Sequence, residues 1–150
     1  MIKKYTTKNF LQTQKIGEKF AADILKMPLQ KTAVVLSFNG NLGGGKTTFI
    51  QGFAKGLGVK RKILSPTFVV MKRFELSGKN FKNFYHIDCY RLKDEKDILE
   101  LDFKKILSNP ENIIAVEWPE KIKKALSKKI VKLYFNFVDK NIREINIETL

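Results

Sequence analysis

A glycine-rich segment carries the strongest chemical signal in this sequence of 150 residues. Residues 40–47, Gly-Asn-Leu-Gly-Gly-Gly-Lys-Thr, match the pattern G-x-x-x-x-G-K-[ST] at every fixed position. The glycines let the backbone curl so that successive N–H groups point at phosphate oxygens. Lys46 places an ammonium against the β- and γ-phosphates, and Thr47 offers a hydroxyl to Mg²⁺. The pattern therefore predicts a phosphate site for ATP and Mg²⁺, built from Gly40 to Thr48.

Two carboxylates at the ends of apolar runs are candidates for the metal and the reaction. Glu117 follows the run 113–116, and a carboxylate ending a second buried strand suits Mg²⁺ held through its waters. Asp88 ends the run 81–88 and is the other candidate, for hydrating the metal or for orienting the attacking water. The structural alternatives are a solvent-facing strand end for Glu117 and an ion pair with Arg91 for Asp88.

Weaker candidates surround these residues. Ser65 and Thr67 flank a proline just before an apolar run, where hydroxyls suit either a γ-phosphate switch or an ordinary turn. His86, the single histidine, alternates with Asp88 on one strand face, and a structural role is the commoner one for a lone histidine. Trp118 follows Glu117, where packing beside the nucleotide site is one role and ordinary packing at a strand end is the commoner one.

The elements that position these residues alternate between helices and strands. Asn9 is expected to cap a helix running to about Met27, with Phe10 among its apolar positions. Residues 33–38 form an apolar run typical of a strand covered on both faces. The next elements are expected as a helix around 49–57, strands at 67–75 and 81–88, a helix at 92–107 and a strand at 113–117. After them, Pro119 is expected to open a short basic helix near 121–126, followed by a strand at 131–137, a hairpin turn at 139–141 and a last strand around 145–147.

This order predicts one domain, residues 1–150, of the α/β class. The expected architecture is a three-layer P-loop NTPase fold whose mixed sheet is parallel in the middle and antiparallel at the margins. The single cysteine, Cys89, excludes an intrachain disulfide, and no apolar run reaches the length that spans a bilayer. We therefore expect a soluble cytoplasmic protein. The net charge of +14 favours acidic partners such as RNA, although the scattered basic residues equally suit lysine used for solubility.

Four motifs in order extend the match beyond the phosphate site. They are residues 40–49, Ser65–Phe68 (Ser-Pro-Thr-Phe), His86–Leu92 (His-Ile-Asp-Cys-Tyr-Arg-Leu) and Val116–Glu120 (Val-Glu-Trp-Pro-Glu). Together they resemble the TsaE (YjeE) family, the bacterial ATPases of tRNA threonylcarbamoyladenosine biosynthesis, over nearly the whole chain. Asn41 departs from the Asp usual in the family, and Cys89 stands where an aliphatic residue is common.

The resemblance implies a slow Mg-dependent ATPase that assists the TsaB–TsaD pair, without itself transferring the threonylcarbamoyl group to tRNA. TsaD and TsaB are then the partners, and tRNA is met through the complex. The implied catalytic residues are Asp88, Glu117 and Lys46, with Thr47 and Glu117 serving the metal. The implied nucleotide-binding residues are Asn9, Thr13, Asn41, Leu42, Gly43, Gly44, Gly45, Lys46, Thr47 and Thr48.

Other classes of protein share the phosphate site. A small P-loop kinase also needs an acceptor pocket and usually a basic lid, for which 150 residues leave little chain. A GTPase lacks support, because no Asn-Lys-x-Asp segment is present. A binding module that changes shape with ATP but scarcely hydrolyses it is the third alternative.

Overall fold

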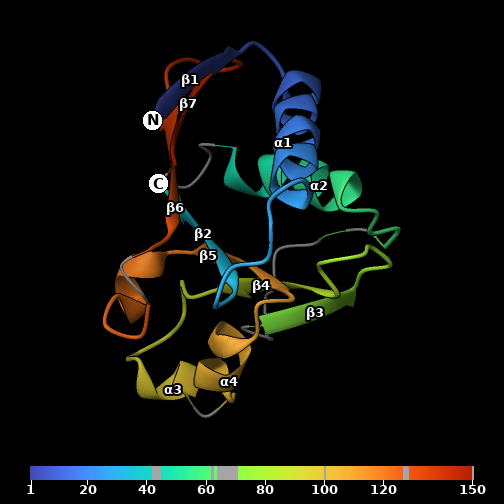
Figure 1. Ribbon diagram of the computed structural model, residues 1–150. Coiled ribbons are helices and arrows are strands. Elements are labelled where there is room, and N and C mark those ends of the chain that lie inside the picture. The colour runs from blue at the N-terminus through green and yellow to red at the C-terminus, as the bar shows by residue number, and fades with distance from the viewer. Residues whose placement is uncertain (42–44, 62, 64–70, 100, 127–128, 150) are drawn as a thin grey trace.

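The computed structural model describes residues 1–41, 45–61, 63, 71–99, 101–126 and 129–149 (Figure 1). Seven strands form one sheet in the order β1-β7-β6-β2-β5-β4-β3. The strands are β1 Ile2–Thr7, β2 Val34–Asn39, β3 Met71–Glu75, β4 Asn83–Asp88, β5 Asn112–Glu117, β6 Val131–Phe137 and β7 Arg143–Glu148. The helices are α1 Phe10–Leu25, α2 Lys46–Gly56, α3 Lys96–Leu99, α4 Phe103–Ser108 and the 3-10 helix η1 Pro119–Ile122.

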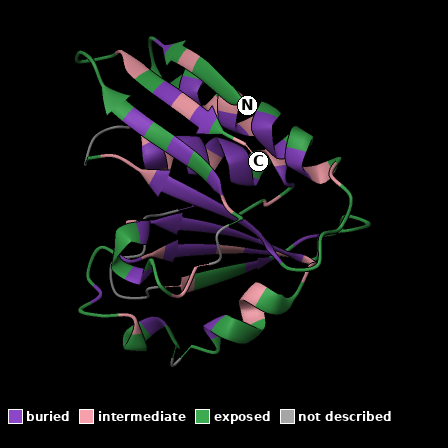
Figure 2. Cartoon of the chain, turned by 60° about the vertical axis from the view of Figure 1, so that its left-hand side comes forward, coloured by how far each residue is buried: buried purple, intermediate pink, exposed green. Residues whose placement is uncertain are grey.

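The middle of the sheet is parallel and its margins are antiparallel, as the sequence predicts. Strand β2 pairs in parallel with β5 and β6, and β4 pairs in parallel with β5. The pairs β1–β7, β6–β7 and β3–β4 are antiparallel. Strands β2 and β5 are buried at almost every position, because helices cover both of their faces (Figure 2). The predicted α/β class with a mixed sheet, parallel in the middle and antiparallel at the margins, is therefore confirmed.

Two apolar layers flank the sheet. Helices α1 and α2 bury one layer, in which Phe38, Phe49 and Phe53 are fully enclosed. The short helices α3 and α4 and the 3-10 helix cover the opposite face, against residues such as Ile87 and Ile114 (Figure 1). The sheet is thus held rigidly on both sides, and the ends of its parallel strands are fixed relative to one another.

Glycines bring α1 and α2 into backbone contact. A Cβ atom on Gly17 would collide with the carbonyl of Phe49, and one on Gly52 would collide with the carbonyl of Gln14. No side chain fits between the helices at these two crossings. The close crossing fixes the beginning of α1, including the predicted residues Asn9 and Thr13, beside the beginning of α2.

Several predicted elements differ from the structure. The N-terminal strand β1 was not anticipated, because most of its residues are exposed at the sheet edge and show no apolar alternation. The helix expected over 92–107 is two short helices, and Asp102 adopts a left-handed backbone (φ 57°) where α4 begins. The basic helix expected over 121–126 is the shorter 3-10 helix that begins at Pro119.

The expected helix from Asn9 is confirmed as α1, although Phe10 lies outside the core and is 64% exposed. In the described part of the chain, no helix combines the length and apolar character needed to cross a membrane.

Candidate functional site

The N-termini of α1 and α2 differ in how their backbone N–H groups are used. The side chain of Asn9 caps α1 by accepting from the Gln12 N–H at 2.9 Å, as predicted. Helix α2 begins after Gly45, which has a left-handed backbone (φ 96°), and no side-chain cap is found there among the described residues. Its first N–H groups are therefore available to an anion, and the helix dipole favours negative charge there.

The predicted residues Leu42, Gly43 and Gly44 lie outside the described residues, as do Ser65, Pro66, Thr67 and Phe68 of the predicted switch. Asn41 is exposed just before this gap. Gly40 has a φ of +133°, and a Cβ atom there would collide with the carbonyl of Phe135. Only glycine fits at this position, where the chain leaves β2.

Lys46 is buried at the first position of α2. Its Nζ donates to the carbonyl oxygen of Gly40 at 2.7 Å and lies 4.1 Å from the ring centroid of Trp118. Burial lowers the pKa of Lys46 below its ordinary value, although the carboxylates of Glu117 and nearby Asp88 and Glu120 act to raise it. The ammonium is thus held in a desolvated place among carboxylates, where a phosphate would supply it with a further partner.

Trp118 covers this lysine from a strained position. Its backbone is left-handed (φ 56°), which is rare for a bulky residue, and its ring packs against Tyr90 at a centroid distance of 5.1 Å. Such a backbone conformation persists only where the surrounding structure holds it, and residues of this kind are found most often at functional sites. The expected packing role of Trp118 thus extends to covering the Lys46 ammonium.

The two predicted carboxylates lie side by side. Asp88 and Glu117 are register partners at the carboxyl ends of the parallel strands β4 and β5. Glu117 is 4% exposed, so the solvent-facing alternative is wrong for it. Its Oε2 lies 2.8 Å from Nε2 of the buried His86. Asp88 is half-buried, and its Oδ1 accepts from the Tyr90 N–H at 3.0 Å.

A cavity of about 430 Å³ brings most of the predicted site together. Its walls include these predicted residues: Asn9, Thr13, Gly45, Lys46, Thr47, Thr48 and Glu117. Asp88 lies next to Glu117 in the sheet rather than in this wall. The Thr13 hydroxyl is hydrogen-bonded to that of Thr7 at 2.7 Å, so its polar group already fixes the end of β1 to α1.

Sequence reasoning missed part of the cavity lining. Lys140, Asn141 and Arg143 of the β6–β7 hairpin line the cavity, together with Trp118 and with Phe10, which was expected only as an apolar position of α1. The Arg143 guanidinium donates to the carbonyl oxygen of Asp139 at 2.8 Å and lies 4.4 Å from the Phe137 ring centroid. The sequence indicates the β6–β7 hairpin but not that it lies near the beginning of α1. That proximity depends on the long-range pairing of β7 with β1, the strand that precedes α1.

The donor set suits a hard cation bound together with phosphate. Among the described residues, no three His, Cys, Asp or Glu side chains converge on one metal position. A cation here would take the Thr47 hydroxyl and the Glu117 carboxylate and would complete its shell with waters and ligand oxygens, which Mg²⁺ prefers.

Comparison with known proteins agrees with these motifs. Residues 7–145 match the model of the family described as threonylcarbamoyl adenosine biosynthesis protein TsaE. The chain is 34% identical over 142 residues to the tRNA threonylcarbamoyladenosine biosynthesis protein TsaE of Bacillus subtilis, covering 95% of this chain and 82% of that one. It is 38% identical over 109 residues to the protein of that name in Haemophilus influenzae, covering 71% of this chain and 65% of the relative.

A solved structure is similar over the whole fold. The crystal structure of Bacillus subtilis YdiB superposes with a TM-score of 0.70 at 30% identity, covering 98% of this chain and 84% of that chain. The motifs, the sheet and the extent of these matches agree. The chain belongs to the TsaE family, whose named members are proteins of tRNA threonylcarbamoyladenosine biosynthesis.

Proposed function

We propose that this chain is an Mg²⁺-dependent ATPase that assists a TsaB–TsaD complex in threonylcarbamoylation of the tRNA adenosine next to the anticodon. It does not itself transfer the group. The observation that carries the ATPase proposal is the uncapped beginning of α2, where Lys46, Thr47 and Glu117 line one cavity. A tRNA-modifying role also favours a cytoplasmic location.

The residues present fit a nucleoside triphosphate. The α2 N–H groups and Lys46 neutralise phosphate charge, and the Lys46 ammonium exchanges its bond to Gly40 for phosphate oxygens. Arg143 and Lys140 add positive charge to the same cavity, and the exposed Phe10 lines it as well. This part of the lining is suited to the base and ribose, with the hydrogen bonds of Asn9 and Thr13 fixing the beginning of α1.

The carboxylates divide the remaining work. When bound, Mg²⁺ neutralises charge developing on the transferred phosphoryl group. Thr47 and Glu117 would hold that ion, and Asp88, one strand away, would orient the attacking water. Lys46 lies close enough to both carboxylates for their charge to raise its pKa, although burial lowers that pKa more strongly.

The partner proposal rests on the family's named pathway. A γ-phosphate bound at Lys46 can order neighbouring loops and so create or remove a docking face. The energy of ATP is then used in the assembly rather than on an acceptor bound by this chain. We expect tRNA to be contacted through the complex.

Phosphate release in the presence and absence of purified TsaB and TsaD tests both parts of the proposal. Stimulated release without any phosphorylated acceptor supports the assisting ATPase, whereas phosphate transfer to a small molecule would support the kinase alternative. A chain that binds no ATP by calorimetric titration would refute the nucleotide site. ATP binding without stimulation or co-elution would refute only the partner assignment.

A further inference from the structure

His86 is buried beside the proposed metal site but takes no part in the nucleotide cavity. Its side chain is 1% exposed, and its Nε2 lies 2.8 Å from Oε2 of Glu117, whose side chain is 5% exposed. An ionised carboxylate only accepts hydrogen bonds, so Nε2 must carry the proton that is shared between them. The contact therefore uses one oxygen of Glu117, while Glu117 also lines the cavity.

The sheet register explains why the Glu117 side chain contacts His86, although its register partner is Asp88. Glu117 lies directly opposite Asp88, whereas His86 lies opposite the small residue Ala115. Two carboxylates facing each other across neighbouring strands repel. Glu117 instead reaches diagonally back along β4 to the imidazole, and Ala115 leaves room for the ring. The contact thereby holds one oxygen of the Glu117 carboxylate at the imidazole.

We propose that His86 is a positioning residue for Mg²⁺: it fixes the rotamer of Glu117 through Oε2 and leaves Oε1 to the hydrated cation. Carboxylates that ligate metals are themselves commonly held by such hydrogen bonds, and loss of the outer partner weakens metal binding. This inference rests on the proposed function, since it assigns Glu117 to the metal. The rival explanation is a purely structural pair that joins β4 to β5.

Two amides provide matched variants of His86. In His86→Gln the side-chain nitrogen falls close to the position of Nε2, so the hydrogen bond to Glu117 is retained. In His86→Asn the nitrogen falls near the position of Nδ1 and does not reach Glu117. Both replacements are neutral, polar and no larger than imidazole. The two variants therefore have the same charge and differ in the hydrogen bond to Glu117 and in one methylene.

The measurement is ATP affinity by calorimetric titration with and without Mg²⁺, with kcat and KM determined in parallel. We expect His86→Gln to behave like the wild type. His86→Asn should lose about ten- to a hundred-fold of the affinity that Mg²⁺ adds. Its affinity for ATP without Mg²⁺ should remain that of the wild type. Circular dichroism verifies folding, and His86→Leu replaces His86→Asn if the latter does not fold.

The Glu117→Ala background separates positioning from structure. If His86 acts through Glu117, adding His86→Asn to Glu117→Ala changes ATP affinity no further. The inference would be overturned if His86→Asn still lowered ATP affinity in the Glu117→Ala background, or if it lowered ATP affinity equally with and without Mg²⁺. Loss of function in a folded His86→Gln variant would overturn it as well. If wild-type ATP affinity does not respond to Mg²⁺, the proposed metal site fails and the role of His86 fails with it. A retained Mg²⁺ response in His86→Asn refutes the role of His86 alone.

Discussion

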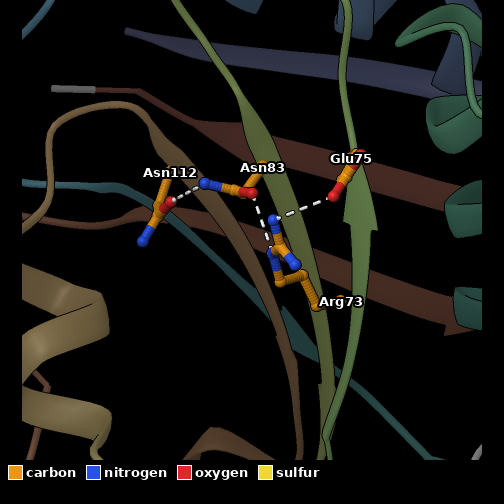
Figure 3. A network of polar contacts seen from close by, with 4 residues as sticks. All are labelled: Arg73, Glu75, Asn83 and Asn112. Carbon is orange, nitrogen blue, oxygen red and sulfur yellow. Dashed lines mark hydrogen bonds and ion pairs between the residues drawn. The ribbon is translucent and has the colours of Figure 1, made fainter.

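Strands β4 and β5 carry a polar cluster at each end, and the two clusters are built from different chemistry. At the amino ends, the Asn83 amide donates to Asn112 Oδ1 at 2.9 Å and Arg73 donates to Asn83 Oδ1 at 2.9 Å, with Glu75 3.4 Å from Arg73 (Figure 3). At the carboxyl ends, Asp88 and Glu117 are register partners. Glu117 lies 2.8 Å from the buried His86, and the charges of both carboxylates act on the buried Lys46.

The amino-end cluster satisfies itself. Asn112 accepts from Asn83 and donates to the carbonyl oxygen of Ile106 at 2.9 Å, so its amide joins two strands to α4. The carboxyl-end cluster is ionisable, lies against a cavity, and contains a lysine whose pKa is lowered by burial. Burying ionisable groups costs free energy, and the two strands do so only at their carboxyl ends. Such groups with a perturbed pKa beside a cavity indicate a functional site.

The largest effect is expected at Lys46 and Thr47, where both Lys46→Ala and Thr47→Ala should abolish ATP hydrolysis. Lys46→Ala removes a charged contact worth about 1.5–3 kcal/mol and weakens ATP binding about ten- to a hundred-fold with or without Mg²⁺. Thr47→Ala should mainly remove the gain that Mg²⁺ provides. Calorimetric titrations under the two conditions distinguish the variants. Wild-type hydrolysis in either one would refute the phosphate site.

The second prediction compares the two ends of strand β5 directly. Glu117→Ala should abolish turnover while ATP still binds, because the N–H groups of α2 and Lys46 continue to hold phosphate. Asn112→Ala should lower the free energy of unfolding by about 1–3 kcal/mol, since it leaves buried partners unsatisfied, but turnover per folded molecule should not change. Urea unfolding and phosphate release, measured on both variants, test the contrast. Normal turnover in Glu117→Ala would transfer the metal role to Asp88.

The third prediction concerns Asp88, which lies beside the cavity. If Asp88 orients water, Asp88→Ala should leave ATP bound and trap the chain in the TsaB–TsaD assembly. Size-exclusion chromatography of the mixed proteins with ATP and with ADP measures the trapping. Normal hydrolysis by Asp88→Ala within the assembly would assign this carboxylate a structural role.

Local patterns predicted the parts of the site that depend on neighbouring residues. The glycine-rich motif located Lys46 and Thr47, Asn9 was identified as the α1 cap, and the apolar runs located both carboxylates at strand ends. These features follow from spacing along a few residues. The parallel middle of the sheet was predicted because its strands are apolar on both faces.

Non-local features were not predicted, because sequence spacing contains no strand register. The proximity of Glu117 to His86 requires β4 and β5 to pair with one specific offset. Arg143 reaches the cavity only because β7 pairs with both β6 and β1. Trp118 covers Lys46 through an unusual backbone conformation that no local pattern indicates.

The smallest expected effect is a pair of opposite pH dependences in the carboxyl-end cluster. Burial lowers the pKa of Lys46, so between its folded pKa and the ordinary value of 10.5 the unfolded chain binds more protons than the folded chain. The contribution of Lys46 to stability therefore rises with pH in that window. Burial, with the charge of Asp88, raises the pKa of the fully buried Cys89 thiol from 9.0 to about 12, so its contribution falls as pH rises above 9.0.

Lys46→Met and Cys89→Ala isolate these two contributions. The free energy of unfolding is measured with urea at several alkaline pH values. As pH rises, the wild type should become more stable relative to Lys46→Met and less stable relative to Cys89→Ala. Each slope is limited to about 1.4 kcal/mol per pH unit, because one proton is involved in each case. The same Cys89 burial predicts slow alkylation of the folded chain, in contrast to rapid labelling in urea. If both stability differences changed with pH in the same direction, burial would not be the dominant influence on the pKa of both groups. The contrast between the two ends of the sheet would then depend on the carboxylates alone.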